Sequence, residues 1–321
     1  MSNKYNYTGD YMLKRASFRR IMVATLALFI LLIIYFFPTT TPIEESLSYI
    51  EKQEMPIFLV DSLEYIARTS IVKESGNTND LILEVIESLT INSEKSNYIR
   101  DGFKGIIPEE TKVNSIKLEN GILTIDFSKE LLNVEKGKEE KMIEAIVYSL
   151  LEIKEIKKIS ILVEGEKLSY LPNTSEKLPE FLDKSYGVNK IYNFDSIKDT
   201  SKTTIYYLSK YNDYYYYVPV TKISNETTEK AEIIIKELKS TPIYHTNLIS
   251  YLAASTNLTN YELLENSISL SFDNHLLANL HDEDMLEEVK YSIALSLRDS
   301  YGIEKVLFNY PDSEEEVMAF N

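Results

Sequence analysis

An internal repeat constrains the fold of this 321-residue chain more than any other feature of its sequence. The apolar alternation of residues 123–127 (LTIDF) returns 145 residues later in residues 268–272 (ISLSF). Residues 146–150 (IVYSL) return 147 residues later as residues 293–297 (IALSL). Similarity at a long fixed period indicates that one supersecondary unit occurs twice. The sequence therefore predicts two tandem copies of one small domain.

Both copies carry the same order of expected elements, which is two short strands, a helix, a β-hairpin, a second helix and a final strand. The strands are expected at 57–60, 65–72 and 159–163 and again at 204–208, 214–223 and 306–310, the second helices at 138–153 and 283–299, and the hairpin turns at 119–121 and 265–267. Asn120-Gly121 is a strong hairpin signal because both residue types accept a positive φ. The ββαββαβ order predicts two helices on one face of a mainly antiparallel sheet, an α+β fold.

An apolar run of 17 residues lies near the N-terminus, from Ile21 to Phe37, with Thr25 as its one polar residue. A helix of that length spans roughly 26 Å, near the lower limit for crossing a bilayer. Arg19 and Arg20 precede the run, so the positive-inside rule places the N-terminus in the cytoplasm and residues 38–321 outside the cell membrane. A cleaved signal peptide would look similar, but no small-x-small site follows the run, which favours a retained single-pass anchor.

These features divide the chain into seven segments. We expect a cytoplasmic basic tail at 1–20, a transmembrane helix at 21–37, a stalk at 38–55, a first domain at 56–170, a linker at 171–202, a second domain at 203–312 and an acidic tail at 313–321.

Charge and cysteine content exclude several classes of function. The net charge is −16, and the part that follows the apolar run carries nearly all of the acidic excess. An acidic body repels phosphates, so nucleic acid is not an expected partner. The chain has no cysteine, which excludes disulfides, thiolate metal sites, cysteine nucleophiles and a lipoprotein anchor.

Residues 107–112 (IPEETK) lead into the predicted hairpin, which ends in residues 126–128 (DFS). This stretch resembles the GerM domain of bacterial sporulation and germination proteins, which has an I-P-x-G-T-K segment, a strand, a turn with glycine and a strand ending in D-F-S. Residues 216–221 (YYVPVT) of the second copy resemble the Y-L-V-P-V-T strand of the same family. Glu110 replaces the glycine that the family usually has, and the second copy lacks the I-P-x-G-T segment.

The resemblance covers about 57–165 and 203–311, and it implies modules similar to ring-building motifs. It further implies a scaffold or assembly role in the cell envelope, with other envelope proteins or the chain itself as partners. It implies no catalytic residues.

A search for chemistry finds no catalytic, cofactor or metal motif. His245, His275 and His281 have spacings that fit no zinc motif. The chain contains no G-x-S-x-G, no Walker A and no G-x-G-x-x-G sequence. We therefore expect a protein that is not an enzyme and holds no cofactor.

The tyrosines Tyr214, Tyr215, Tyr216 and Tyr217 form the one candidate binding face. Alternation along a strand places half of them on each face of a sheet. One interpretation is that one set packs under the helices while the other supports cross-strand pairs. The other is an exposed aromatic face, which would favour an alternative function as a module that binds peptidoglycan or another surface polymer.

Overall fold

The structure is a computed structural model that describes residues 8–36, 53–74, 76–196, 198–240, 247–273, 276, 283–311 and 315–320. It divides into two compact units, residues 1–51 and 52–321, each of which is described by itself.

The first unit contains one helix, α1 (Thr8–Phe36), whose described side chains are exposed. Its apolar part, from Ile21 to Phe36, measures about 24 Å at 1.5 Å per residue, whereas the hydrocarbon core of a bilayer is about 30 Å thick. Among the described residues, no helix has the length and apolar character needed to cross a membrane. The structure therefore does not support the transmembrane helix predicted for residues 21–37.

The second unit contains both repeats. The first repeat comprises β1 (Glu54–Asp61), β2 (Ile66–Val72), α2 (Thr78–Leu89), β3 (Phe103–Lys104), β4 (Val113–Glu119), β5 (Ile122–Phe127), α3 (Glu139–Leu150), β6 (Lys158–Val163) and β7 (Glu166–Lys167). The second comprises β9 (Ser201–Tyr211), β10 (Tyr214–Ser224), α4 (Lys230–Leu238), β11 (Leu258–Leu263), β12 (Ser267–Phe272), α5 (Glu283–Tyr301), β13 (Lys305–Asn309) and β14 (Glu316–Ala319). Between them, β8 (Ile191–Asn193) belongs to a connector that spans residues 171–200.

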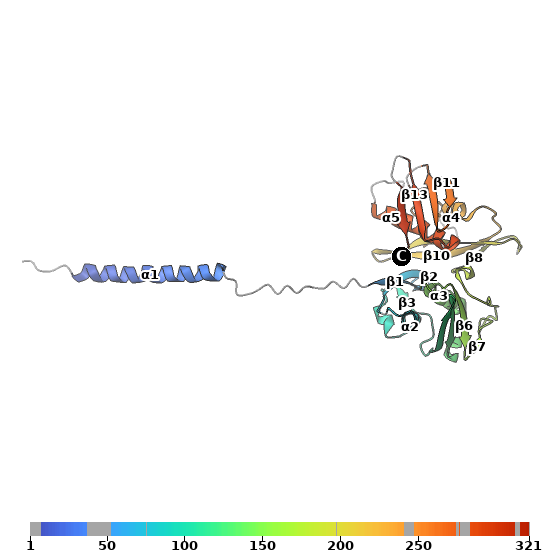
Figure 1. The fold of residues 1–321 in the computed structure, drawn as a ribbon, viewed down its shortest axis with the longest axis horizontal. Helices are drawn as coiled ribbons and strands as arrows, with labels where there is room; N and C mark the ends of the chain where they lie inside the picture. Colours follow the sequence, from blue (N-terminus) through green and yellow to red (C-terminus); the bar gives the residue numbers. More distant parts are fainter. Residues whose placement is uncertain are drawn as a thin grey trace, which may run out of the picture. The chain divides into compact units, whose positions relative to one another are not determined.

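The strands form three sheets, two of which lie on opposite sides of the third in Figure 1. The central sheet has the order β3-β1-β2-β10-β8, with β9 paired to β10, so the opening hairpins of both repeats share it. The backbones of the two hairpins pair at Arg68 on β2 and Tyr217 on β10. The outer sheets are β4-β5-β6-β7 and β11-β12-β13-β14.

The sheet arrangement corrects the prediction of one mainly antiparallel sheet for each copy. β5 pairs with β6 in parallel, and β12 pairs with β13 in parallel. Each pair is joined through a helix, α3 or α5, and a helical crossover returns the chain in the same direction as the strand before it. The α+β class is correct, and the predicted turn at Asn120-Gly121 is confirmed by positive φ angles of 51° and 78°.

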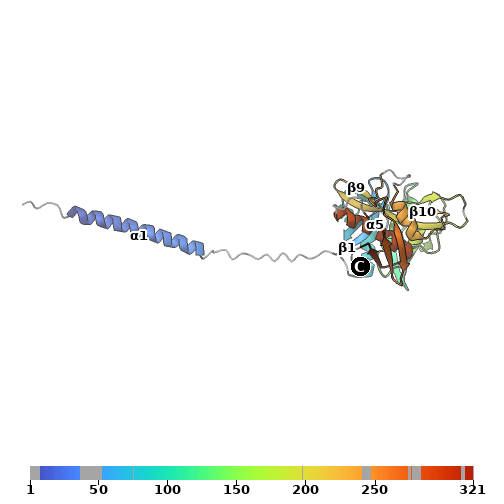
Figure 2. The ribbon, with the colours of Figure 1, turned by 90° about the horizontal axis from the view of Figure 1, so that it is seen from above.

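The helices pack against the central sheet through serine as well as through apolar side chains. The backbone N–H of Phe58 on β1 donates to Ser149 Oγ on α3 at 2.9 Å. In the second repeat, the N–H of Tyr206 on β9 donates to Ser296 Oγ on α5 at 2.8 Å. Figure 2 labels the two elements, β9 and α5. Both serines are buried. Each therefore satisfies a strand N–H that would otherwise be buried without a partner.

Three predicted segments differ from the structure. Glu54 and Met55 were predicted to belong to the stalk, but they begin strand β1. The linker is built into the fold, because β8 pairs in parallel with β10 and Val188 is fully buried. The acidic tail contains β14, which pairs with β13, because the alternation of residues 316–319 places Met318 against the second-repeat core.

Candidate functional site

The tyrosine-rich strand does not form an open aromatic face. Tyr216 is only 4% exposed. Its hydroxyl donates to Asp61 Oδ2 of the first repeat at 2.8 Å and accepts from Ser209 Oγ at 3.0 Å. Burial raises the pKa of Tyr216, and burial also raises the pKa of Asp61 even though three hydrogen bonds oppose it. This tyrosine therefore joins the two repeats.

The other three tyrosines also contact neighbouring elements of the chain. Tyr214 donates to the carbonyl of Asp101, and Tyr217 donates to Glu288 on α5. The hydroxyls of Tyr215 and Tyr251 lie 3.0 Å apart. Of the two interpretations of residues 214–217, these contacts favour the one in which the tyrosines pack within the fold, with Tyr216 buried and Tyr214, Tyr215 and Tyr217 half-buried.

A buried ion cluster lies where the first repeat, the connector and the second repeat meet. Arg298 on α5 makes a two-pronged contact with Glu152 of the first repeat, Nη1 to Oε2 at 3.0 Å and Nη2 to Oε1 at 2.7 Å. Lys184 of the connector bridges Glu152 and Asp299, with its Nζ 2.7 and 2.6 Å from their oxygens. The hydroxyl of Tyr206 donates to the second oxygen of Asp299 at 2.5 Å. We call these residues the junction cluster.

Charge balance keeps the acids of the junction cluster ionised. Burial alone raises the pKa of Glu152 and of Asp299, but the charges of Lys184 and Arg298 outweigh burial and hold both values below the ordinary range. The two carboxylates are 5% and 1% exposed. Because every strong acceptor is occupied and solvent is excluded, the cluster fixes the repeats to each other and leaves no acid free to act on a substrate.

Repeat symmetry explains where the cluster forms. Glu152 follows α3, and Asp299 occupies the matching position 147 residues later, near the end of α5. The pair Arg68 and Tyr217 joins the corresponding strands β2 and β10, although the two residues do not hold matching positions in the repeats. The two acids meet at the contact between the repeats, where Lys184 and Arg298 supply the opposite charge.

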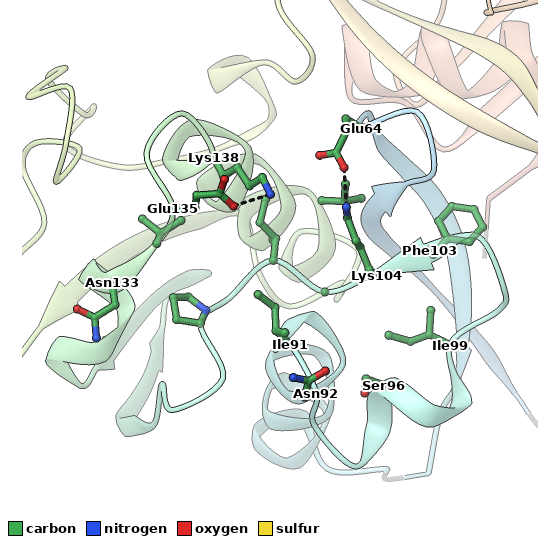
Figure 3. A pocket seen from close by; sticks show the side chains of 15 residues that line it. Glu64, Ile91, Asn92, Ser96, Ile99, Phe103, Lys104, Asn133, Glu135 and Lys138 are labelled. Carbon is green, nitrogen blue, oxygen red and sulfur yellow. Dashed lines mark hydrogen bonds and ion pairs between the residues drawn. The ribbon is translucent and has the colours of Figure 1, made fainter.

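A pocket lies in the first repeat of the folded unit (Figure 3). Its volume is about 520 Å³, and it lies between the segment after α2, the extended residues 103–108 and the turn before α3. Apolar side chains form its floor and one wall: Val60, Ile91, Ile99, Phe103, Ile106 and Val134. The volume is within the usual range for ligand sites.

Two ion pairs stand at the pocket (Figure 3). Lys104 Nζ lies 2.5 Å from Glu64 Oε1, and Lys138 Nζ lies 2.7 Å from Glu135 Oε2. The hydrogen bond from Lys104 lowers the pKa of Glu64, and the one to Glu135 raises the pKa of Lys138. All four side chains are more than one third exposed, so a ligand in the pocket can reach them. We call these two pairs the pocket rim.

Comparison with known proteins identifies the repeats. The family model for Germane, "Sporulation and spore germination", matches residues 47–169. The chain is 25% identical over 256 residues to the spore germination protein GerM of Bacillus subtilis (strain 168), which covers 78% of this chain and 69% of the relative. It also matches a solved structure, the tandem GerMN domains of the sporulation protein GerM from Bacillus subtilis, with a TM-score of 0.73 and 21% identity over 84% of this chain and 97% of that one. The chain is a tandem GerM-domain protein.

The pocket lies beside the segment that carries the family resemblance, since Pro108 of the IPEETK stretch lines it. Among the described residues, this GerM-domain protein has no group of three or more histidine, cysteine or acidic side chains placed to hold a metal ion. His245, His275 and His281 lie outside the described residues.

Sequence reasoning missed both the junction cluster and the pocket. A usable signal existed for the cluster, because Glu152 and Asp299 hold the same position in the two copies next to helices rich in apolar residues. Side chains at the pocket come from four separate segments with no shared motif, so no local pattern marks them.

Proposed function

We propose that this tandem GerM-domain protein is a non-enzymatic scaffold of the cell envelope that acts in sporulation or spore germination through protein–protein contacts. The observation that carries the proposal is the junction, where one sheet shared by both repeats and a buried ion cluster join two copies of one module. Two modules fixed in this way present two related surfaces at constant spacing and orientation, which suits an assembly role.

Chemical features of the folded unit support a role without catalysis. A catalytic pair of acids needs separated pKa values and access to a substrate. The most closely placed acids of the junction, Glu152 and Asp299, are instead buried and paired with cations. The named relatives are described as sporulation and spore germination proteins, which supports the biological setting of the proposal.

Binding of a wall polymer through the tyrosine-rich strand is a weaker candidate, because the rings of Tyr216 and Tyr217 pack against Phe103 and Tyr291 and their hydroxyls donate within the chain. Glycan recognition requires an aromatic face open to the ligand.

In-cell crosslinking tests the scaffold proposal. We expect a crosslinker applied to intact sporulating cells to capture the full-length protein with a second protein or with another copy of itself. Arg298→Met, which weakens the junction, should reduce the yield of those products at equal protein level, whereas Lys117→Met on the exposed strand β4 should leave it unchanged. Capture of only the uncrosslinked monomer under conditions that crosslink other envelope assemblies would contradict the proposal.

Placement of residues 38–321 outside the cytoplasm remains a separate prediction. Accessibility of a C-terminal tag to an impermeant label in intact cells would support it, and labelling only after lysis would contradict it.

A further inference from the structure

We propose that the pocket of the first repeat binds a short basic segment of a partner polypeptide, in which one large apolar side chain enters the pocket and flanking lysine or arginine side chains meet the rim. This inference rests on the scaffold function and names the chemistry of one of its contacts.

The apolar part of the pocket provides the anchor site. Val60, Ile106 and Val134 are almost fully buried and form a firm floor. Ile91, by contrast, is 40% exposed at the mouth. A partner side chain that covers Ile91 gains free energy in proportion to the apolar surface that it removes from water. Leucine, isoleucine, methionine or phenylalanine has the size that such a cavity accepts.

The pocket rim can change partners at small cost. Its two pairs, Glu64 with Lys104 and Glu135 with Lys138, are solvent-exposed, and pairs of this kind contribute little to stability. A ligand cation can therefore replace a lysine beside either glutamate without a large penalty. The junction cluster could not exchange in this way, because its charges are buried.

The charge of the chain favours a basic ligand over an acidic one. The rim itself is neutral, with two acids and two lysines. Glu109 adds a third acid, which accepts from Asn92 Nδ2 at 3.1 Å. Lys141, which donates to the carbonyl of Glu64, adds a third lysine. The local charge is therefore balanced, and the preference comes from the charge of the whole chain. The whole chain carries a net charge of −16, which attracts cationic segments over longer distances. A polyanion would be repelled by the same field.

The shape of the site favours a polypeptide over a compact small molecule. Residues 103–108 run along the pocket as an extended segment, beginning with β3, and both rim pairs lie on one side of this segment while Ile91 and Asn92 lie on the other (Figure 3). An apolar core with a polar rim is the usual composition of a protein–protein contact. The pocket therefore fits a side chain presented by an extended backbone.

Peptide binding to the full-length protein tests the inference. The probe is a fluorescent decapeptide with one phenylalanine between two lysines in a glycine-serine background, measured by anisotropy. We expect saturable binding that weakens as salt is raised, because exposed charges are screened. Peptides with glutamate in place of lysine, or glycine in place of phenylalanine, should bind at least about tenfold more weakly.

Two substitutions place that binding at the pocket. Ile91→Trp fills the mouth, and Glu135→Lys reverses one rim charge, so each should weaken the lysine-phenylalanine peptide at least about tenfold. Glu135→Lys should also bring the glutamate peptide closer in affinity to the lysine peptide. Leu83→Trp on the exposed side of α2 and Glu119→Lys on the β4–β5 turn are matched controls that should have no effect.

Equal affinity for the three peptides, or binding that Ile91→Trp and Glu135→Lys leave unchanged while circular dichroism shows a native fold, would overturn the inference. The in-cell crosslinking separates its failure from failure of the scaffold proposal. If Ile91→Trp leaves the crosslinked products intact, the scaffold stands and the pocket is not its contact. If no crosslinked product forms even for the unaltered protein, the scaffold proposal itself fails.

Discussion

The junction cluster and the pocket rim use the same side-chain chemistry in opposite ways. Both are built from glutamate or aspartate paired with lysine or arginine at 2.5–3.0 Å. At the junction, Glu152 and Asp299 are shut away from water, whereas Glu64 and Glu135 at the rim are open to it. Removing one partner of a buried pair strands a charge, but removing one partner of an exposed pair returns the other to water. Buried ion pairs therefore hold the two repeats together, whereas exposed ion pairs of the same chemistry can be replaced by a ligand.

The largest expected effect is at the junction. Arg298→Met removes the two-pronged partner of Glu152 and leaves Lys184 as the one cation of the junction cluster that contacts the two acids. We expect a loss of about 3–5 kcal/mol in the free energy of unfolding, measured by urea titration. Lys117→Met, at an exposed ion pair, is the control. A loss below about 1 kcal/mol would mean that the cluster contributes little to the joint.

Acid should weaken the same joint. The folded-state pKa values of Glu152 and Asp299 lie below their ordinary values of 4.5 and 3.8, so their contribution is complete above about pH 5 and is lost as pH falls. Between pH 5 and pH 3 the unaltered protein should therefore lose more stability than a Glu152→Gln variant. Urea midpoints compared across this range test the difference, and parallel curves for the two proteins would contradict it.

The aromatic contact between the repeats should give a smaller change. Tyr216→Phe removes the hydroxyl that donates to Asp61 and accepts from Ser209, leaving two buried polar groups each short of one partner. A loss of about 1–3 kcal/mol is expected by chemical denaturation. Tyr98→Phe, at an exposed ring, should be neutral. Equal stability of both variants would show that water replaces the lost partner.

The smallest effect is expected at the pocket rim. Glu135→Gln breaks an exposed pair with Lys138, and the change in unfolding free energy should stay below about 0.5 kcal/mol. The same variant should still weaken the binding of the basic peptide, because it removes a charge that faces the ligand. If Glu135→Gln destabilised the protein as much as Arg298→Met does, the proposed difference between the junction cluster and the pocket rim would be wrong.

Much of the fold could be predicted because its signals are local. Alternation in residues 123–127 and 268–272 marked strands, and Asn120-Gly121 marked a turn whose φ angles only a few residue types accept. The order of the two strands and helix that open each repeat follows from the same kind of pattern. Pairing between strands far apart in the sequence has no local sequence pattern. The shared central sheet and the parallel pairs of β5 with β6 and β12 with β13 were therefore not predicted.

The sites were harder to predict than the fold. The tyrosines at 214–217 drew attention by composition, but their role depends on Asp61, Asp101 and Glu288, which lie far away in the sequence. Lys184 fell in a segment without periodicity that was expected to be a linker, yet it occupies the middle of the junction cluster. Its importance comes from two acids that only the folded chain brings together.

The most direct test asks whether the two repeats unfold together. The chain has no tryptophan, so Tyr98→Trp places a unique fluorescent probe in the first repeat and Tyr261→Trp places one in the second. If the junction makes the repeats one cooperative unit, urea transitions reported by the two single-tryptophan proteins should have the same midpoint and slope, and Arg298→Met should separate them. Transitions that are already separate in proteins with an intact junction would contradict a fixed tandem scaffold.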